Sequence, residues 1–462
     1  MPRLVEREFD VIVIGAGAAG ENAADRVVQG GLTAVLVEAE LVGGECSYWA
    51  CMPSKALLRP IELQAAARRI PGLPVGELDA AAVLERRDAF ASHWDDSGQE
   101  RWADGAGITT VRGHGRLTGE RTVQVGDRTL TARHAVVLAT GTTAAVPPID
   151  GLREARPWIS RDVTSMKEVP RRLLVLGGGV VACEMAQAVR GLGAEEVTVL
   201  ERGPGLLGRM EPWAGELVAD GLRAVGVEVR TGAQVTAVRR EGTTVTVTLA
   251  DGTELIGDEV LCALGRRPAT EDLGVEVVGL EPGRSVPVDD TLRVDGVDWL
   301  YAAGDVNGRS LLTHMGKYQG RICGDAIAAR ARGEEPPTRA TSDAAAVPQV
   351  VFTDPQACSV GLTEREARDR GVDVRVVSYE LGNVAGASLQ GDGYTGRAAL
   401  VVDERRRVIV GATFVGPEVA ELLHSATIAV VGEVTLDRLW HAVPSYPTVS
   451  EVWLRLLEEY GL

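Results

Sequence analysis

The residues best suited to chemistry are two cysteines five positions apart, Cys46 and Cys51, within the segment GGECSYWACMPSK at 43–55. Pro53 suits the first turn of a helix, so a cysteine just before it meets the positive end of that helix. Lys55 adds a positive charge one turn further on, and both effects favour the thiolate. The pair predicts redox chemistry. The alternatives are two small buried cysteines, or half of a metal site, for which no further cysteine or histidine ligands lie nearby.

A glycine-rich turn near the N-terminus predicts a dinucleotide site. The apolar run 10–14 leads into Gly15, Gly17 and Gly20, a helix-prone stretch follows, and the next apolar run ends at Glu38. Gly15 allows the tight turn, Gly17 lets the backbone approach a pyrophosphate, and Gly20 lets the helix pack on the strand. The helix N-terminus then faces the phosphates, and Glu38 can accept hydrogen bonds from ribose hydroxyls. The alternative is a glycine-rich turn without a ligand.

The same strand-glycine-helix pattern recurs in the middle of the chain, with Gly177 and Gly179 after a second apolar strand. Glu201 takes the place of the acidic residue of the first copy, and a carboxylate there favours the free 2′-hydroxyl of NADH over a 2′-phosphate. Arg202 follows directly and could receive that phosphate. We therefore expect NADH as the nicotinamide cofactor, with NADPH possible, and two βαβ nucleotide-binding units in one α/β chain.

The composition restricts the class of protein. The 462 residues include 65 acidic and 48 basic ones, giving a net charge of −17, which argues against nucleic acid or an anionic membrane surface as a partner. No stretch of signal-peptide form precedes the first strand, and no run of about 18 apolar residues predicts a membrane span. Six cysteines in a chain of this length do not make a disulfide scaffold. We expect a cytoplasmic protein of about three domains.

Further elements must position these motifs. The patterns predict helices over 52–70 and 78–103, strands over 108–140 and 226–264, and a linker over 331–342. From about residue 345 the chain mixes strands with helices: strands 350–353, 374–379, 398–402 and 408–414, and helices 418–431 and 449–459.

The segment 43–55 resembles the redox-active helix of the flavoprotein disulfide reductases, the family of glutathione reductase, lipoamide dehydrogenase and mercuric reductase. The resemblance covers essentially the whole chain, because other motifs of the family follow in the right order. These are Thr140-Gly141 after the first FAD strands, GRRP at 265–268, YAAGD at 301–305 as the second FAD motif, and FTDP at 352–355 with GLTE at 361–364. The resemblance implies FAD and NAD(P)H as cofactors and a homodimer.

The implied fold is α/β, with two Rossmann-like FAD- and NAD(P)-binding domains plus an α+β C-terminal dimerisation domain. We expect the FAD-binding domain over 1–150 and 272–342, the NAD(P)-binding domain over 151–271, and the dimerisation domain over 345–462.

The resemblance also implies roles for single residues. Cys46 resembles the interchange thiol that meets substrate, and Cys51 the thiol against the flavin. Lys55 and Glu184 resemble the ion pair beside flavin N5 and the nicotinamide. The segment 312–315 resembles a loop whose backbone amides meet the flavin pyrimidine edge. The expected cofactor-binding residues are Gly15, Gly17, Gly20, Glu38, Gly44, Lys55, Thr140, Gly141, Gly177, Gly179, Glu201, Gly265, Gly304, Asp305 and Thr313.

The C-terminal motif departs from the family. Members supply a catalytic histidine, followed by Pro-Thr, and a glutamate five positions on, both from the partner subunit. Here Tyr446 takes the histidine position and Glu451 that of the glutamate, while His441 lies five residues too early and would need a loop shift. Tyrosine, with a pKa near 10, is a poor base at neutral pH but can donate a hydrogen bond. Tyr48 and Trp49 replace small residues of the family and would place bulky aromatics beside the thiols.

We therefore expect an FAD-dependent NAD(P)H oxidoreductase that passes electrons, via flavin and a Cys46–Cys51 disulfide, to a small acceptor such as a quinone, a dye or an unusual disulfide. The first alternative is a lipoamide dehydrogenase or another low-molecular-weight disulfide reductase. Tyrosine at 446 also resembles mercuric reductase and the soluble transhydrogenases. However, mercuric reductase has a terminal cysteine pair that is missing here, and the transhydrogenases usually lack the cysteine pair present here. The last alternative is a catalytically weak NADH-responsive flavoprotein. No metal site is expected.

Overall fold

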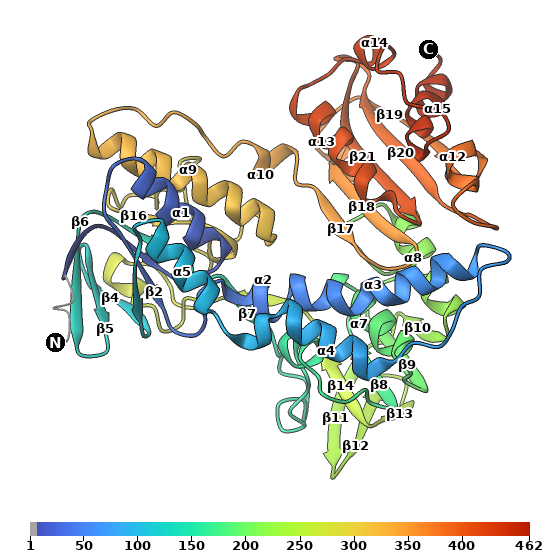
Figure 1. Cartoon of the computed structure of the whole chain (residues 1–462), viewed down its shortest axis with the longest axis horizontal. Coiled ribbons are helices and arrows are strands. Elements are labelled where there is room, and N and C mark those ends of the chain that lie inside the picture. The colour runs from blue at the N-terminus through green and yellow to red at the C-terminus, as the bar shows by residue number, and fades with distance from the viewer. Residues whose placement is uncertain (1–6) are drawn as a thin grey trace. The chain divides into compact units, whose positions relative to one another are not determined.

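The structure is a computed structural model that describes residues 7–462. It divides into two compact units (Figure 1). Within the described residues no helix is both long and apolar enough to cross a bilayer. Unit 1 comprises the chain up to Met52, Asp88–Ala144 and Arg266–Ala344, and unit 2 comprises Pro53–Arg87, Ala145–Gly265 and Ala345–Leu462.

Unit 1 is built on a mainly parallel sheet of order β3-β2-β1-β6-β5-β4, with β16 also paired to β6. The residues of β1 and β2 are mostly buried valine, isoleucine and leucine, as expected for strands covered on both faces. The chain passes from β1 to β2 and β3 on one side and to β6 on the other, so the strand order reverses at β1. Ligands of α/β sheets bind beyond the carboxyl ends of strands at such a switch point. The strands are β1 (Glu8–Ile14), β2 (Ala34–Glu38), β3 (Thr109–Arg112), β4 (Gly115–Gly119), β5 (Thr122–Val125), β6 (Arg128–Leu138) and β16 (Leu300–Ala302), with β7 (Thr142–Ala144) paired to β15 (Arg266–Pro268).

Helices α1 (Ala18–Gln29) and α9 (Thr313–Ala331) lie side by side in unit 1 (Figure 1). Glycines of α9 make this close packing possible. A Cβ at Gly320 would lie 2.4 Å from the carbonyl oxygen of Ala19, and one at Gly324 would lie 2.6 Å from that of Ala23. Two segments far apart in the sequence therefore share one tightly packed interface.

Two local predictions are wrong. The loop predicted at 312–315 is instead the beginning of α9, which starts at Thr313. Glycine lowers helix propensity, but burial of α9 against α1 stabilises the helix. The predicted helical stretch 78–103 is interrupted at Ser92–Trp94, where φ is 50°, 51° and 57°, in the left-handed region. The other helical elements over 44–105 and 275–345 are α2 (Gly44–Tyr48), α3 (Cys51–Arg68), α4 (Ala80–Phe90), η1 (Ser92–Trp94), α5 (Ser97–Gly105), η2 (Val275–Val278), η3 (Asp305–Asn307) and α10 (Ser342–Ala345).

Unit 2 contains the second parallel sheet, of order β10-β9-β8-β14, and an antiparallel sheet of order β11-β12-β13. Helix α7 packs on β8 and β9 through buried small and apolar residues, which places its N-terminus after the second glycine turn. The elements are α6 (Ser160–Thr164), β8 (Arg172–Leu176), α7 (Val180–Gly191), β9 (Glu196–Glu201), α8 (Pro212–Ala224), β10 (Val227–Thr231), β11 (Val235–Glu241), β12 (Thr244–Leu249), β13 (Glu254–Gly257) and β14 (Glu259–Cys262).

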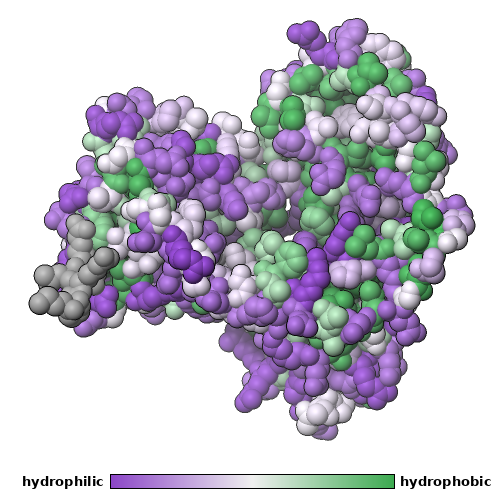
Figure 2. Space-filling model, in the orientation of Figure 1, coloured by the Kyte–Doolittle hydropathy of each residue, from purple (hydrophilic) through white to green (hydrophobic). Residues whose placement is uncertain are grey.

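The C-terminal part of unit 2 is an antiparallel sheet of order β17-β18-β21-β20-β19, covered by helices. Figure 2 shows hydrophobic patches, coloured green, on the surface of the chain. The exposed hydrophobic residues of these C-terminal elements include Leu389, Ile428, Val431 and Val443. The elements are β17 (Gln349–Val351), β18 (Gln356–Gly361), α11 (Glu364–Asp369), β19 (Val374–Glu380), η4 (Leu381–Asn383), α12 (Ala385–Ser388), β20 (Arg397–Asp403), β21 (Val408–Gly416), η5 (Val419–Leu422), α13 (Leu423–Val431), α14 (Leu436–Leu439), η6 (Val449–Glu451) and α15 (Val452–Tyr460).

Candidate functional site

The two cysteines lie together in unit 1, Cys46 on α2 and Cys51 at the first residue of α3, both as thiols. The Cys51 sulfur is 3.3 Å from Thr313 Oγ1, at the first residue of α9, which is within hydrogen-bonding distance. The hydrogen bond to Cys51, and then burial, raise the pKa of Cys46. The neighbouring thiol and burial thus favour the protonated form of Cys46. The thiolate predicted from the helix start is that of Cys51, and it stays a prediction.

The sequence did not single out two charged residues of this region: Lys317, which interacts with Cys46, and Glu21, which interacts with Lys317. The ammonium of Lys317, one turn along α9 from Thr313, lowers the pKa of Cys46. Glu21, in the first part of α1, accepts a hydrogen bond from Gln99 Nε2 at 3.3 Å. Burial raises the pKa of Glu21 to about 7, Lys317 lowers it and Glu38 raises it. Helical spacing from Thr313 could have indicated Lys317, whereas no sequence signal pointed to Glu21.

The first glycine loop has the shape that a dinucleotide phosphate requires. Gly15 has φ +99°, and a Cβ there would lie 2.5 Å from the carbonyl oxygen of Ala139. A Cβ at Gly20 would lie 2.0 Å from the Gly15 carbonyl oxygen, and one at Gly44 would lie 2.6 Å from Gly17 Cα. Gly17 is the N-cap of α1 and offers no side chain to the first-turn amides. Those amides can therefore bind a phosphate that approaches the bare backbone.

Glu38, at the end of β2, lies against this loop. Its Oε2 accepts a hydrogen bond from the Ala16 N–H at 2.7 Å, and its Oε1 accepts one from the Glu40 N–H at 2.8 Å. The carboxylate is thus fixed beside the loop by backbone donors. Its predicted contact with ribose hydroxyls stays a prediction.

The second FAD motif contributes a buried acid. Asp305 Oδ2 accepts a hydrogen bond from Thr142 Oγ1 at 2.9 Å, and Thr142 Oγ1 accepts one from Arg266 Nε at 2.7 Å. Burial raises the pKa of Asp305, while Thr142 and Arg266 lower it. Gly304, just before it, has φ +84° and donates its N–H to Gln319.

Thr140 and Gly141 precede Thr142, the hydrogen-bond partner of Asp305, in the sequence. Thr140 Oγ1 donates to the Ala269 carbonyl at 2.9 Å, and Gly141 has φ +68° with nothing within 4 Å of a Cβ position. A bare glycine loop, open helix amides and a buried carboxyl in one unit fit the pyrophosphate and ribityl chain of FAD.

Unit 2 repeats the glycine arrangement. Gly177 has φ +111°, and its Cβ would lie 2.5 Å from the Ala263 carbonyl oxygen, while Gly179 is the N-cap of α7. Glu201, at the end of β9, accepts a hydrogen bond from the Gly203 N–H. Arg202 is exposed. Gly265, with φ +116°, has open space around its Cβ position. These features fit the pyrophosphate and adenosine ribose of a second dinucleotide.

Lys55 and Glu184 form an ion pair within unit 2, with Nζ 2.7 Å from Oε2. Glu184 is only 3% exposed, and its Oε1 accepts a hydrogen bond from the Phe352 N–H at 3.0 Å. Lys55 Nζ also lies 4.8 Å from the centre of the Phe352 ring. The pair is held from two sides, but its place beside a flavin stays a prediction.

The two residues of the C-terminal motif, Tyr446 and Glu451, differ in burial. Tyr446 is 75% exposed. Glu451 is buried, and its Oε1 accepts a hydrogen bond from Arg455 at 2.6 Å. Its Oε2 is also buried and has no hydrogen-bond partner within residues 7–462. An orphaned carboxylate oxygen can accept a hydrogen bond from a further donor. The catalytic roles of Tyr446 and Glu451 stay predictions.

A cavity of about 340 Å³ lies in unit 1 beside α2. Its wall combines the aromatic and apolar side chains of Tyr48, Met52 and Phe90 with polar groups from Ser92 and the start of α5. Tyr48 donates its hydroxyl to the Val42 carbonyl at 2.9 Å, and burial raises its pKa to about 12. The hydroxyl of this wall residue therefore keeps its proton at physiological pH.

Comparison with known proteins adds to this geometry. The family profile described as pyridine nucleotide-disulphide oxidoreductase matches residues 9–320, and the profile of that family's dimerisation domain matches residues 347–456. A dihydrolipoyl dehydrogenase from Chlamydia muridarum is 31% identical over 455 residues, covering 96% of this chain and 95% of that protein. A mercuric reductase from Staphylococcus aureus is 31% identical over 456 residues, covering 96% and 81%.

Solved structures agree with these matches. The HOCl-induced flavoprotein disulfide reductase RclA from Escherichia coli, as its Cu(II) complex, is 25% identical with a TM-score of 0.85, covering 98% of this chain and 99% of that one. LpdA from Mycobacterium tuberculosis is 25% identical with a TM-score of 0.83, covering 98% and 100%. The comparisons confirm the predicted family resemblance, the α/β fold and the two cofactors, FAD and NAD(P)H.

Proposed function

This chain belongs to the pyridine nucleotide-disulphide oxidoreductase family of FAD-dependent enzymes, and we propose that it oxidises NADH and delivers the electrons to a small acceptor that needs no acid–base catalysis. A quinone or dye fits this description best, and an unusual disulfide is included. The predicted roles of the site residues and the predicted domain boundaries form part of this proposal.

The observation that carries the proposal is the contact of Cys46 with Cys51, which favours the protonated form of Cys46. Its pKa is raised by the hydrogen bond to Cys51 and by burial. To attack a disulfide substrate, Cys46 must lose that proton to a base and the departing thiolate must gain one. The family position for that base holds Tyr446, and a tyrosine is a poor base at neutral pH. Reduction of ordinary disulfides is therefore slow.

FAD, when bound, supplies two-electron transfer from the nicotinamide. The remaining steps involve residues of this chain. Two electrons and one proton cleave a Cys46–Cys51 disulfide to a thiol at Cys46 and a thiolate at Cys51. Thr313 lies at hydrogen-bonding distance from the Cys51 sulfur. Glu184 is fixed by the Phe352 N–H and holds the Lys55 ammonium at a defined point. A quinone takes its electrons without needing Cys46 to be deprotonated.

Steady-state NADH oxidation tests the proposal. The acceptors are lipoamide, glutathione disulfide, a water-soluble quinone, mercuric ion, Cu(II) and thio-NAD. We expect quinone turnover to exceed lipoamide turnover by about 10²-fold or more, the size of a missing general base. Cys46→Ser is the matched control, because it should remove disulfide turnover and leave quinone turnover. Lipoamide reduction as fast as quinone reduction would contradict the proposal.

Specific observations favour two other activities. The 31% identity to a dihydrolipoyl dehydrogenase over nearly the whole chain favours lipoamide. The comparable identity to a mercuric reductase, with the tyrosine at 446, favours a thiophilic metal ion. The acceptor panel distinguishes them, since each predicts one fast substrate. Turnover that is weak with every acceptor would instead identify an NADH-responsive flavoprotein.

A homodimer completes the proposed enzyme. The match to the family's dimerisation domain over 347–456 supports it. Exposed Ile428, Val431 and Val443 give the C-terminal elements an apolar surface of the kind that a partner subunit covers. Light scattering on the purified protein measures the oligomeric state directly.

A further inference from the structure

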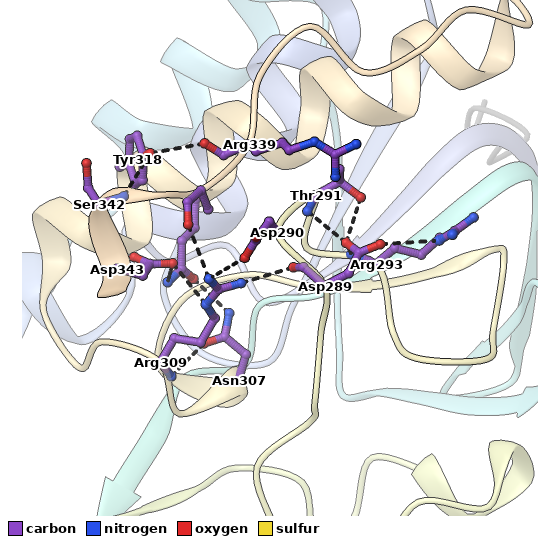
Figure 3. Close-up of polar contacts among 12 residues, drawn as sticks. Asp289, Asp290, Thr291, Arg293, Asn307, Arg309, Tyr318, Arg339, Ser342 and Asp343 are labelled. Atoms are coloured by element: carbon purple, nitrogen blue, oxygen red, sulfur yellow. Dashed lines mark hydrogen bonds and ion pairs between the residues drawn. The ribbon is translucent and has the colours of Figure 1, made fainter. Parts of the chain in front are cut away.

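Polar residues from separate parts of unit 1 meet around Asp343, at the end of the 331–342 linker (Figure 3). The Asp343 side chain is 1% exposed, and its Oδ2 accepts a hydrogen bond from Gln319 Nε2 at 3.1 Å and pairs with Arg309 Nε at 3.2 Å. The other oxygen, Oδ1, is buried without a hydrogen-bond partner in the described chain. A carboxylate with one buried oxygen unpaired lowers stability.

Gln319 connects Asp343 to the second FAD motif. Its Oε1 accepts hydrogen bonds from the Gly304 N–H and from Asn307 Nδ2, both at 2.8 Å. The side chain is completely buried. An amide group has an oxygen that only accepts and a nitrogen that only donates. Because the Asp343 carboxylate accepts, it holds the Gln319 nitrogen on its own side, and the oxygen must face Gly304.

The orientation of the Gln319 amide matters for cofactor binding. Gly304 has φ +84° and immediately precedes Asp305, the buried acid of the second FAD motif. If the amide rotated by half a turn, its NH₂ group would face the Gly304 N–H, donor against donor. The peptide that carries Asp305 would then lose its fixed position.

The linker is fastened to the same place. The Ala340 N–H donates to the Asp290 carbonyl at 2.7 Å, and Arg309 Nη2 donates to the Ala340 carbonyl at 3.2 Å. Tyr318, beside Gln319 on α9, donates its hydroxyl to the Arg339 carbonyl at 3.4 Å. Asp343 therefore reaches Gln319 when the end of the linker is attached to unit 1.

We infer that Asp343 is a positioning residue for FAD: it orients the Gln319 amide, which fixes Gly304 and with it Asp305. Attachment of the linker and binding of FAD are consequently coupled, and each strengthens the other by the same factor. This coupling does not depend on the electron acceptor, so it is tested separately from the proposed function.

Two substitutions at one position separate hydrogen bonding from packing. Asp343→Leu keeps the branching at Cγ but puts methyl groups in place of the oxygens and so removes the acceptor, whereas Asp343→Asn keeps both the size and an oxygen for Gln319. We expect Asp343→Leu to raise the FAD Kd of the apoprotein about tenfold, the effect of one unsatisfied buried donor. Asp343→Asn should stay within about threefold of wild type, because its amide oxygen accepts the same hydrogen bond. Quenching of FAD fluorescence on titration of the apoprotein gives both values.

Trypsin cleavage provides a second readout. Arg332 and Arg339 are exposed in the linker. Reciprocal coupling predicts that FAD slows wild-type cleavage after these arginines about tenfold, and that Asp343→Leu loses this protection. Asp290→Asn is the control. The Asp290 carboxylate pairs with the same Arg309, but the Asp290 side chain is 54% exposed. The Asp290 pair with Arg309 does not involve Gln319.

Three results would overturn the inference: FAD that leaves wild-type cleavage unchanged, Asp343→Leu that binds FAD like wild type, or Asp343→Asn that binds it as weakly as Asp343→Leu. If Asp343→Leu fails to fold, the wild-type cleavage rates with and without FAD still decide the question.

Discussion

Replacing Gly44 by alanine tests how closely two loops must approach in the FAD site. A Cβ at Gly44 would lie 2.6 Å from Gly17 Cα, whereas ordinary contact begins at 3.4 Å, so the loops must separate by 0.8 Å. Overpacking of this kind costs about 1–3 kcal/mol. The left-handed φ of +65° adds backbone strain of about 1–2 kcal/mol. Since Gly17 begins the phosphate-binding turn, we expect about 10–100-fold weaker FAD binding, at 1.4 kcal/mol for each tenfold change.

Gly126→Ala provides the matched control. Gly126 has nearly the same φ, +59°, in the same unit, but nothing lies within 4 Å of its Cβ position. It should share the backbone strain of Gly44→Ala without the collision, and its FAD Kd should stay within about threefold of wild type. Kd is measured by titrating each apoprotein with FAD. If both variants bound FAD equally well, the Gly17–Gly44 approach would not belong to the cofactor site.

Four further predictions concern single residues. Glu201→Ala should narrow the preference for NADH over NADPH in kcat/KM, because a carboxylate repels a 2′-phosphate; a wild type that prefers NADPH would refute this. Cys51→Ser should lower dithionite uptake by two electrons per subunit, and unchanged uptake would mean that the cysteines are redox-inactive. Tyr446→His should raise lipoamide turnover by about 10-fold or more, since the free Oε2 of Glu451 can orient an imidazole; no gain would mean that another group limits this reaction. Burial raises the pKa of Glu21 from 4.5 to about 7, so the fold loses stability as the pH rises through this range. Glu21→Gln should remove that loss and increase the free energy of unfolding of the apoprotein at pH 8 by about 1–3 kcal/mol, and equal urea midpoints at pH 8 would contradict it.

Local patterns predicted much of the fold. The glycine turns at Gly15 and Gly177, each after a strand of apolar residues, are short-range signals, and both parallel sheets follow from them. The start of helix α9 was not predicted, because glycines lower the helix propensity of this segment. Tertiary packing on α1 stabilises the helix in the structure. The strand β18 was also missed. It is short and contains few β-branched residues, yet it pairs with two neighbours inside the C-terminal sheet.

The residues of the site could be predicted where they belong to motifs that resemble the family. The Lys55–Glu184 pair joins residues 129 positions apart and could be expected only from the family resemblance. Spacing along one element does not reveal which side chains of distant elements meet, so Glu21 and Asp343 were not anticipated. The raised pKa of Cys46 could not be predicted from the sequence for a related reason. A helix start is visible in the sequence, whereas burial and the hydrogen bond to Cys51 are not.

The order in which unit 1 is synthesised has a consequence for how the protein matures in the cell. Helix α1 ends at Gln29 and α9 begins at Thr313, so the ribosome adds 284 residues between the end of the first helix and the start of the second. At about 5–20 residues per second, a ribosome needs roughly 15–60 s to cover that distance. Throughout this interval the small-residue face of α1 has no α9 to cover it, while the parallel sheet of unit 2 is already emerging. A nascent chain arrested before Ala331 should therefore bind chaperones and retain no FAD, and release of the chain with α9 complete should mark the onset of cofactor capture.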